Sequence, residues 1–217
     1  MHKALVVSAT LRHLTTTAAD DVVPIEPIEW WHRLCWVTPQ LALCGDLGDD
    51  IASMKSHLAE WVDAGITDII DTRVEADDTK FVARLAPHIG YRWLGVDDDD
   101  GRQADEWFDA GAAAVISAVV DPSARVVVHC HMGVNRGPSL LFAAMLAMGH
   151  RPVDAISAIR AARPIAAVLY ADDAVNWWVR RTGSAHSHRL DVRRWQRENP
   201  LDTGWIVQRL WAGSQSA

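Results

Sequence analysis

The sequence predicts an α/β fold with a central, largely parallel sheet flanked by helices. Short apolar runs rich in valine and isoleucine alternate along the chain with longer segments whose apolar residues recur at helical spacing. That alternation is typical of a parallel sheet covered by helices. Two polar loops each follow a predicted strand, and ligands of such sheets bind beyond the carboxyl ends of the strands.

The first half of the chain is expected to open with a hairpin, because Pro39 and Gly45 punctuate an apolar run. A helix follows, since Met54, Leu58 and Trp61 lie at helical spacing and an aspartate stands before its start. The elements expected in this half are a hairpin over 36–44, a helix from Asp49 or Asp50 to the residue before Gly65, a strand over 66–71, a helix over 77–86 and a strand over 91–96.

The second half continues the same alternation. Trp107, Phe108 and Val115 mark the inner face of a long helix, and the run of valines from 126 to 128 is typical of a buried strand. The elements expected here are a helix over 104–120, a strand over 125–129, and helices over 138–148, 152–162 and 171–181. Both candidate loops follow strands, so we expect them to meet at one edge of the sheet.

Composition indicates one soluble domain with an appendage at each end. The chain has 217 residues, 49% of them hydrophobic, which is enough to bury a substantial core. We expect an N-terminal extension packing on the core over 1–36, a catalytic domain over 37–182, and an extension rich in arginine and tryptophan over 183–217. The tryptophans of the last segment favour docking on the body of the protein.

Charge and hydropathy narrow the classes of partner. The net charge of −7 argues against bulk nucleic-acid binding. The longest apolar stretch, 140–148, is too short to cross a bilayer, which needs about 20 residues. Cys35, Cys44 and Cys130 form an odd set that does not suit a disulfide framework, so a reducing, cytoplasmic location is expected.

The most informative motif is His129-Cys130-His131-Met132-Gly133-Val134-Asn135-Arg136, which lies between a buried strand and a predicted helix. A tight loop entering a helix turns successive backbone N–H groups inward, and the helix N-terminus adds partial positive charge. Arg136 supplies a planar fork suited to phosphate oxygens. An ordinary cysteine, with a pKa of about 8.5, is mostly protonated at neutral pH, and these groups are expected to favour the thiolate.

At these residues the chain resembles the cysteine-dependent protein phosphatases, in particular the dual-specificity phosphatases, whose signature is His-Cys-x-x-Gly-x-x-Arg. The resemblance covers roughly residues 37–181. It implies a protein tyrosine phosphatase-like fold and dephosphorylation through a covalent phosphocysteine on Cys130. It also implies that His131, Met132, Gly133, Val134 and Asn135, together with Arg136, line the phosphate-binding loop, and that His129 orders this loop.

A proton donor for the departing oxygen is expected in the acidic loop 97–100. Clustered carboxylates resist ionising together, which helps one of them stay protonated as a general acid. The resemblance places this acid about ten residues before a helical phenylalanine, and counting back from Phe108 indicates Asp98. Asp100 is the second candidate. On their own, four aspartates are also typical of a solvated turn or a weak cation site.

No metal or organic cofactor is expected. His129 and His131 would extend to one side of an extended segment with Cys130 on the other, which is poor geometry for a three-ligand site.

Two positions depart from the family pattern or add to it. Gly137 stands where relatives carry Ser or Thr, whose hydroxyl stabilises the departing sulfur, so the second chemical step is expected to be slow unless Ser139 fills the role. Arg163 lies in an Arg-Pro pair like the family's, and we expect it to be structural, as a helix C-cap. The Asn or Gln often found downstream of that pair in relatives is not evident.

The sequence thus predicts a phosphoric monoester hydrolase of the tyrosine or dual-specificity type, acting on a phosphorylated protein or small phosphoester. Two alternatives remain open. One is a binding module, or pseudophosphatase, that holds phosphate groups with little or no turnover. The other is a sulfurtransferase, which explains Arg136 less well and leaves the acidic loop without a role.

Overall fold

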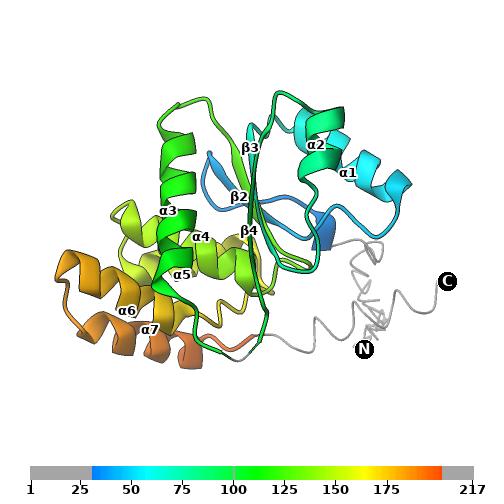
Figure 1. The fold of residues 1–217 in the computed structure, drawn as a ribbon. Helices are drawn as coiled ribbons and strands as arrows, with labels where there is room; N and C mark the ends of the chain where they lie inside the picture. Colours follow the sequence, from blue (N-terminus) through cyan, green and yellow to red (C-terminus); the bar gives the residue numbers. More distant parts are fainter. Residues whose placement is uncertain (1–30, 100, 202–217) are drawn as a thin grey trace, which may run out of the picture.

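The computed structural model describes residues 31–99 and 101–201, which form a five-stranded sheet with helices on both faces (Figure 1). The strands are β1 (Cys35–Trp36), β2 (Leu41–Cys44), β3 (Asp68–Arg73), β4 (Gly90–Val96) and β5 (Val126–His129). Their order in the sheet is β1-β2-β5-β3-β4. Only the β1–β2 pair is antiparallel among these described strands; β2, β3, β4 and β5 run parallel. The predicted α/β class is confirmed.

Two helices cover one face of the sheet. They are α1 (Ile51–Asp63) and α2 (Thr79–Leu85). Asp50 caps α1 as expected, because its carboxylate accepts from the amides of Ala52 at 2.8 Å and Ser53 at 3.0 Å. Trp61 and Leu58 of α1 and Val82 of α2 pack on Ile69 and Val127 of the sheet, forming the smaller of two apolar clusters.

Five helices lie on the other face (Figure 1). They are α3 (Asp105–Val119), α4 (Arg136–Ala147), α5 (Pro152–Ala162), α6 (Ala171–Thr182) and α7 (Ser187–Glu198). Helix α4 is almost wholly buried and lies at the centre of the larger apolar cluster. It leads directly out of the Cys130 loop, so this loop is tied to the best-packed helix of the fold.

Helix α7 lies within the predicted C-terminal extension, for which no secondary structure was predicted. It packs along α5 and α6, and its Val192 is fully buried in the larger cluster. Although four of the twelve residues in α7 are arginines, the helix packs on the body of the protein. Trp195 of α7 also packs against this cluster, so the helix has an apolar face toward the core.

The parallel strands bring four loops to one edge of the sheet. Residues that follow β2, β3, β4 and β5 all lie beyond the carboxyl ends of these strands, since Cys44 and Asp71 both pair with His129. This edge carries the acidic loop and the cysteine loop, as the sequence predicted. No helix within residues 31–99 and 101–201 is long and apolar enough to span a membrane.

Candidate active site

The cysteine loop runs from Cys130 to Asn135, between the end of β5 and the start of α4 at Arg136. Cys130, the first residue of this loop, is buried, with 1% of its surface exposed. Gly133 turns the loop with a φ of +63°, and a Cβ at this position would stand 2.5 Å from the carbonyl oxygen of Cys44. The turn therefore requires glycine, both for its backbone conformation and for its close approach to β2.

Arg163 holds the outside of the cysteine loop. Its guanidinium is buried and donates to the carbonyl oxygens of Gly133 and Met132, each at 2.8 Å. It also donates to the carbonyls of Trp31 at 2.9 Å and Arg33 at 3.3 Å. Arg163 therefore has a structural role, as expected, but the predicted partner is wrong. Its side chain binds loop carbonyls and does not cap the end of α5. These bonds pair two buried carbonyls of the cysteine loop and fix its conformation.

Arg136 is the first residue of α4 and is 4% exposed. Its two terminal nitrogens donate to the two carboxylate oxygens of Glu75, at 2.6 and 2.8 Å, and one of them also donates to the carbonyl of Val96 at 3.2 Å. These hydrogen bonds lower the pKa of Glu75 to about 2. The Nε–H of Arg136 is buried and makes no hydrogen bond within the described residues, although Oδ2 of Asp98 lies 3.4 Å away.

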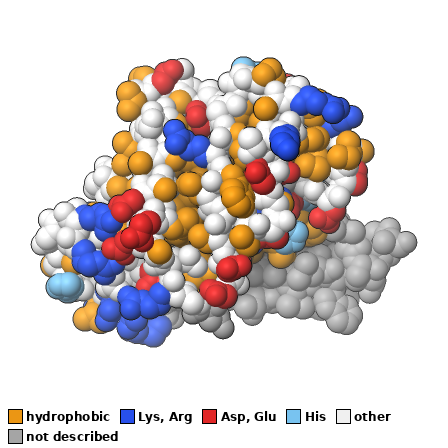
Figure 2. Space-filling view, viewed as in Figure 1, with side chains coloured by type: hydrophobic (Ala, Val, Ile, Leu, Met, Phe, Trp, Pro, Cys, Tyr) orange, Lys and Arg blue, Asp and Glu red, His pale blue; other side chains and the backbone are white. Residues whose placement is uncertain are grey.

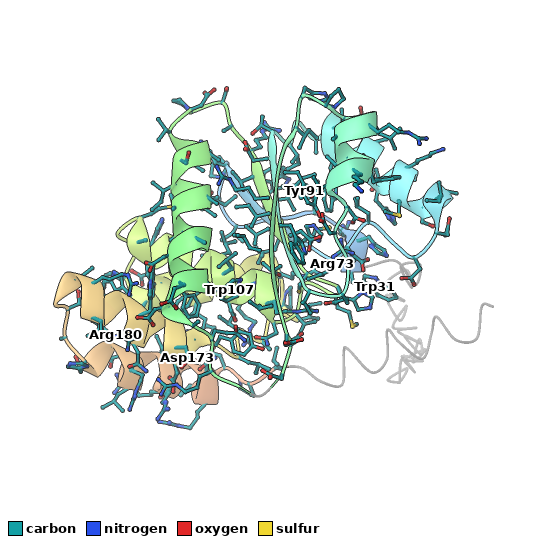
Figure 3. All side chains as sticks on the ribbon, viewed as in Figure 1. Trp31, Arg73, Tyr91, Trp107, Asp173 and Arg180 are labelled. Atoms are coloured by element: carbon teal, nitrogen blue, oxygen red, sulfur yellow. The ribbon has the colours of Figure 1, made fainter. Side chains whose placement is uncertain are left out.

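Glu75 was not among the predicted site residues. It follows β3 in the segment Asp71-Thr72-Arg73-Val74-Glu75, so its place after a buried strand was the available signal. Arg73 fixes this segment: it is buried and bound to Asp71 at 2.7 Å and Asp78 at 2.5 Å. Tyr91 donates to Asp71 at 2.6 Å, and Arg73 and Tyr91 lie close to one another beside the sheet (Figure 3). A buried ionic network therefore fixes the segment that carries Glu75.

Asp98 lies beside the cysteine loop. Its Oδ1 accepts from the side-chain amide of Asn135 at 2.7 Å and from the hydroxyl of Tyr170 at 3.3 Å. The single hydroxyl hydrogen of Tyr170 is shared with the carbonyl of Asp99, which lies closer, at 2.9 Å. Burial raises the pKa of Tyr170, with Asp98 adding to the effect, so its hydroxyl remains a donor at neutral pH. Asp100, the second candidate acid, lies outside the described residues.

The two histidines of the motif have different surroundings. His129 is fully buried against Trp61, at a ring-centroid distance of 5.3 Å, and its Nε2 lies 3.8 Å from Asp71. Burial lowers the pKa of His129, which outweighs the attraction of Asp71, so its ring is neutral. His131 is half exposed and its Nδ1 lies 2.6 Å from the buried carboxylate of Asp46. Its carbonyl also accepts from the amide of Asp46 at 2.9 Å, which ties the loop to the end of β2.

Gly137 and Ser139 show how the helix start is packed. A Cβ on Gly137 would stand 3.1 Å from the carbonyl carbon of His129 and 3.3 Å from the amide nitrogen of Cys130. Glycine therefore lets α4 approach the strand that delivers the cysteine. The hydroxyl of Ser139 lies 3.2 Å from Oδ1 of Asn135 and 3.3 Å from the amide of Tyr170. Ser139 thus supports Asn135, and these contacts do not direct it toward Cys130.

The geometry brings most of the predicted residues together. Cys130, Arg136, Asp98 and Asn135 lie at one loop cluster, with Glu75 and Tyr170 as additions that sequence reasoning missed. Within residues 31–99 and 101–201, no group of three or more His, Cys, Asp or Glu side chains is arranged to hold a metal ion. Chemically, the cluster offers a sulfur nucleophile, one unpaired guanidinium N–H and a neighbouring carboxyl group.

Comparison with known proteins gives matches in structure only. No protein-family model matches the chain, and no curated protein matches it in sequence. A solved mouse protein, described as a putative dual specificity phosphatase complexed with zinc tungstate, matches with a TM-score of 0.57 and 20% identity over 70% of this chain and 90% of that one. Human DUSP28 matches with a TM-score of 0.53 and 20% identity, over 66% and 91% of the two chains. PTPMT1 in complex with PI(5)P matches with a TM-score of 0.54 and 16% identity, over 70% and 99%.

The cysteine loop lies at the carboxyl edge of a parallel sheet, and these structural matches each cover 66% or more of the chain. Together they define the fold of the cysteine-dependent phosphatases. Within that class, the chain is similar to the dual-specificity phosphatases, as the mouse protein and DUSP28 both indicate. The predicted resemblance is confirmed at the level of the fold.

Proposed function

We propose that this protein is a phosphoric monoester hydrolase that acts through a phosphocysteine on Cys130, as a protein tyrosine or dual-specificity phosphatase. The observation that carries the proposal is the state of Arg136. Glu75 binds the two terminal nitrogens of its guanidinium, while the buried Nε–H makes no hydrogen bond within the described residues, although it lies 3.4 Å from the carboxylate of Asp98. A buried unpaired donor is costly, and a phosphate oxygen at this point would satisfy it.

The first step follows from this arrangement. The thiolate of Cys130 attacks phosphorus while the phosphate oxygens receive hydrogen bonds from the loop amides and from Arg136. The bond between phosphorus and the leaving oxygen breaks, and the carboxyl group of Asp98 donates a proton to that oxygen. Asn135 and Tyr170, which both donate to Asp98, hold its side chain over the loop.

The second step releases phosphate. Water attacks phosphorus, the sulfur–phosphorus bond breaks, and Asp98, now a carboxylate, accepts a proton from the water. Cys130 leaves as a thiolate again. These steps use only water and side chains of the chain. They require a reduced thiol, and we therefore propose that the protein acts in the cytoplasm.

Hydrolysis of an aryl phosphate tests the proposal. Cys130→Ser should abolish turnover, and Asp98→Asn should lower kcat/KM for phenyl phosphate, whose leaving group needs a proton, by about 10²-fold or more, the usual contribution of a general acid. Asp100→Asn serves as the matched variant, since it removes the second candidate acid from the same loop. If Asp100→Asn causes the large loss and Asp98→Asn does not, the assignment of the acid is wrong. Turnover that survives Cys130→Ser would refute the proposed chemistry.

A second candidate is a pseudophosphatase that binds phosphate groups without turnover. Gly137 favours it, because no hydroxyl stands next to Arg136 to assist release of the sulfur. The two candidates separate in one experiment with an aryl phosphate. Binding of the oxyanion tungstate with no release of phosphate would support the binding module, while a burst followed by steady release supports the enzyme.

A further inference from the structure

The segment 165–170 connects the cysteine loop with the acidic loop. The amide of Ala167 donates to the carbonyl of Val134 at 2.7 Å, and the amide of Leu169 donates to Oδ1 of Asn135 at 2.8 Å. Tyr170, at the end of the segment, donates to Asp98 and Asp99. The segment therefore contacts Asn135 and includes Tyr170, the two residues whose side chains bind Asp98.

Val168, in the middle of this segment, has a φ of +52° and is the only non-glycine residue of the described chain with a positive φ. A β-branched residue in this conformation is strained by about 1–3 kcal/mol, and such strain persists only where surrounding contacts fix it. Its side chain is fully buried, and its carbonyl accepts from the amide of Ala171 at 3.1 Å. The backbone thus turns sharply at Val168, next to the residues that contact Asn135 and Asp98.

Helix α7 supplies a further contact to the strained turn. The side-chain amide of Gln196 lies 3.4 Å from the carbonyl oxygen of Val168 and 3.5 Å from that of Ala167, and donates to both. These are long hydrogen bonds, but they come from one side chain to two successive carbonyls. Gln196 therefore braces the turn at Ala167 and Val168, next to Leu169, whose amide donates to Asn135.

Helix α7 is itself firmly seated. Val192 is buried in the main apolar cluster, and the guanidinium of Arg160 stacks over the ring of Trp195 at 5.6 Å. Arg160 also donates to the carbonyl of Asn199 at 3.2 Å, and Arg193 pairs with Asp172 of α6. Figure 2 shows arginine side chains gathered over α6 and α7 beside acidic ones. A helix anchored along its C-terminal half can hold Gln196 in place.

We propose that Gln196 is a positioning residue for the general acid: α7 fixes the turn at Val168, and through Asn135 and Tyr170 this turn aims Asp98 at the leaving oxygen. The inference rests on the proposed phosphatase function. It assigns to the C-terminal helix a role in proton transfer, in addition to its packing on α5 and α6.

The test compares two substrates that differ only in their leaving groups. p-Nitrophenolate departs readily without a proton, whereas phenolate needs one, so misplacing Asp98 affects phenyl phosphate more than p-nitrophenyl phosphate. Gln196→Met keeps the length of the side chain and removes the donor. It should lower kcat/KM for phenyl phosphate about 5-fold, the ratio that one neutral hydrogen bond supplies, and for p-nitrophenyl phosphate less than about 2-fold.

Two comparisons exclude a general loss of structure. Arg197→Ala changes an exposed side chain of the same helix and should leave the ratio of the two rates unchanged. In the Asp98→Asn background, Gln196→Met should cause no further change in that ratio, because the residue it positions is already disabled. Thermal unfolding of each variant shows whether the fold is intact.

The outcomes separate the inference from the proposed function. If the wild-type protein hydrolyses both substrates and Gln196→Met lowers both rates equally, or neither, the inference is wrong and the function stands. An additional selective loss in the Asp98→Asn background would also overturn it. If the wild-type protein hydrolyses neither substrate, the proposed function and the inference both fail.

Discussion

Gly137→Ser tests why the position after Arg136 carries no hydroxyl. The new Cβ would stand 3.1 to 3.3 Å from backbone atoms of His129 and Cys130, so the start of α4 must shift by a few tenths of an ångström. That crowding costs about 1 kcal/mol, and replacing glycine in a helix returns up to about 1 kcal/mol, so the free energy of unfolding should change little. The added hydroxyl can donate to the departing sulfur. A hydrogen bond to a charged atom contributes about 1.5–3 kcal/mol, which corresponds to at least about a 10-fold faster second step.

Burst kinetics with an aryl phosphate measure this directly. Gly137→Ser should raise the steady-state rate about 10-fold while leaving the rate of the burst nearly unchanged. Gly137→Ala is the matched control, because it introduces the same Cβ without the hydroxyl and should not speed the second step. An unchanged or slower steady state for Gly137→Ser, with the fold intact, would refute this account of the position.

Three other changes probe the site. Glu75→Gln should lower kcat/KM about 5-fold, since a partly exposed ion pair that orients Arg136 contributes about 1 kcal/mol. The lowered pKa of Glu75, about 2, keeps its carboxylate charged above about pH 4, so the pH profile in that range should keep its shape, and a changed shape would contradict the pairing. Arg163→Lys should lower the free energy of unfolding by about 3 kcal/mol or more, because an ammonium group cannot donate to all four buried carbonyls. Chemical denaturation measures this change, and a loss below about 1 kcal/mol would contradict the role of Arg163. The lowered pKa of His129 means that its contribution to stability is complete above the unfolded value of 6.5 and is lost as pH falls below it. His129→Asn should therefore flatten the fall in the free energy of unfolding between about pH 7 and pH 5 by up to about 1.4 kcal/mol per pH unit, and an unaltered slope would show that His129 does not stay neutral.

Local sequence patterns predicted most of the fold because packing repeats with the periods of helices and strands. The helix expected over 152–162 is α5 (Pro152–Ala162), and the strand expected over 66–71 is β3, displaced by two residues. Helix α4 begins at Arg136, two residues before the predicted start, because the arginine already lies in the first turn. Boundaries are set by loop contacts that periodicity does not encode.

The candidate site divides in the same way. Cys130, Arg136 and Asp98 could be predicted because a short motif and a loop after a strand are local features. Glu75 and Gln196 could not, because each acts on a partner far along the chain: Glu75 on Arg136, 61 positions away, and Gln196 on Val168, 28 positions away. Only the arrangement of loops at the sheet edge and the seating of α7 bring them into contact.

The bonds of Arg163 have a practical consequence for shortened versions of this protein. Two of its four carbonyl partners belong to Trp31 and Arg33, in the residues before β1. A recombinant fragment that starts at residue 37 would leave unsatisfied part of the buried guanidinium that binds the cysteine loop, and would be a poor reagent for measuring catalysis. Fragments intended for crystallography or kinetics should therefore begin upstream of Trp31.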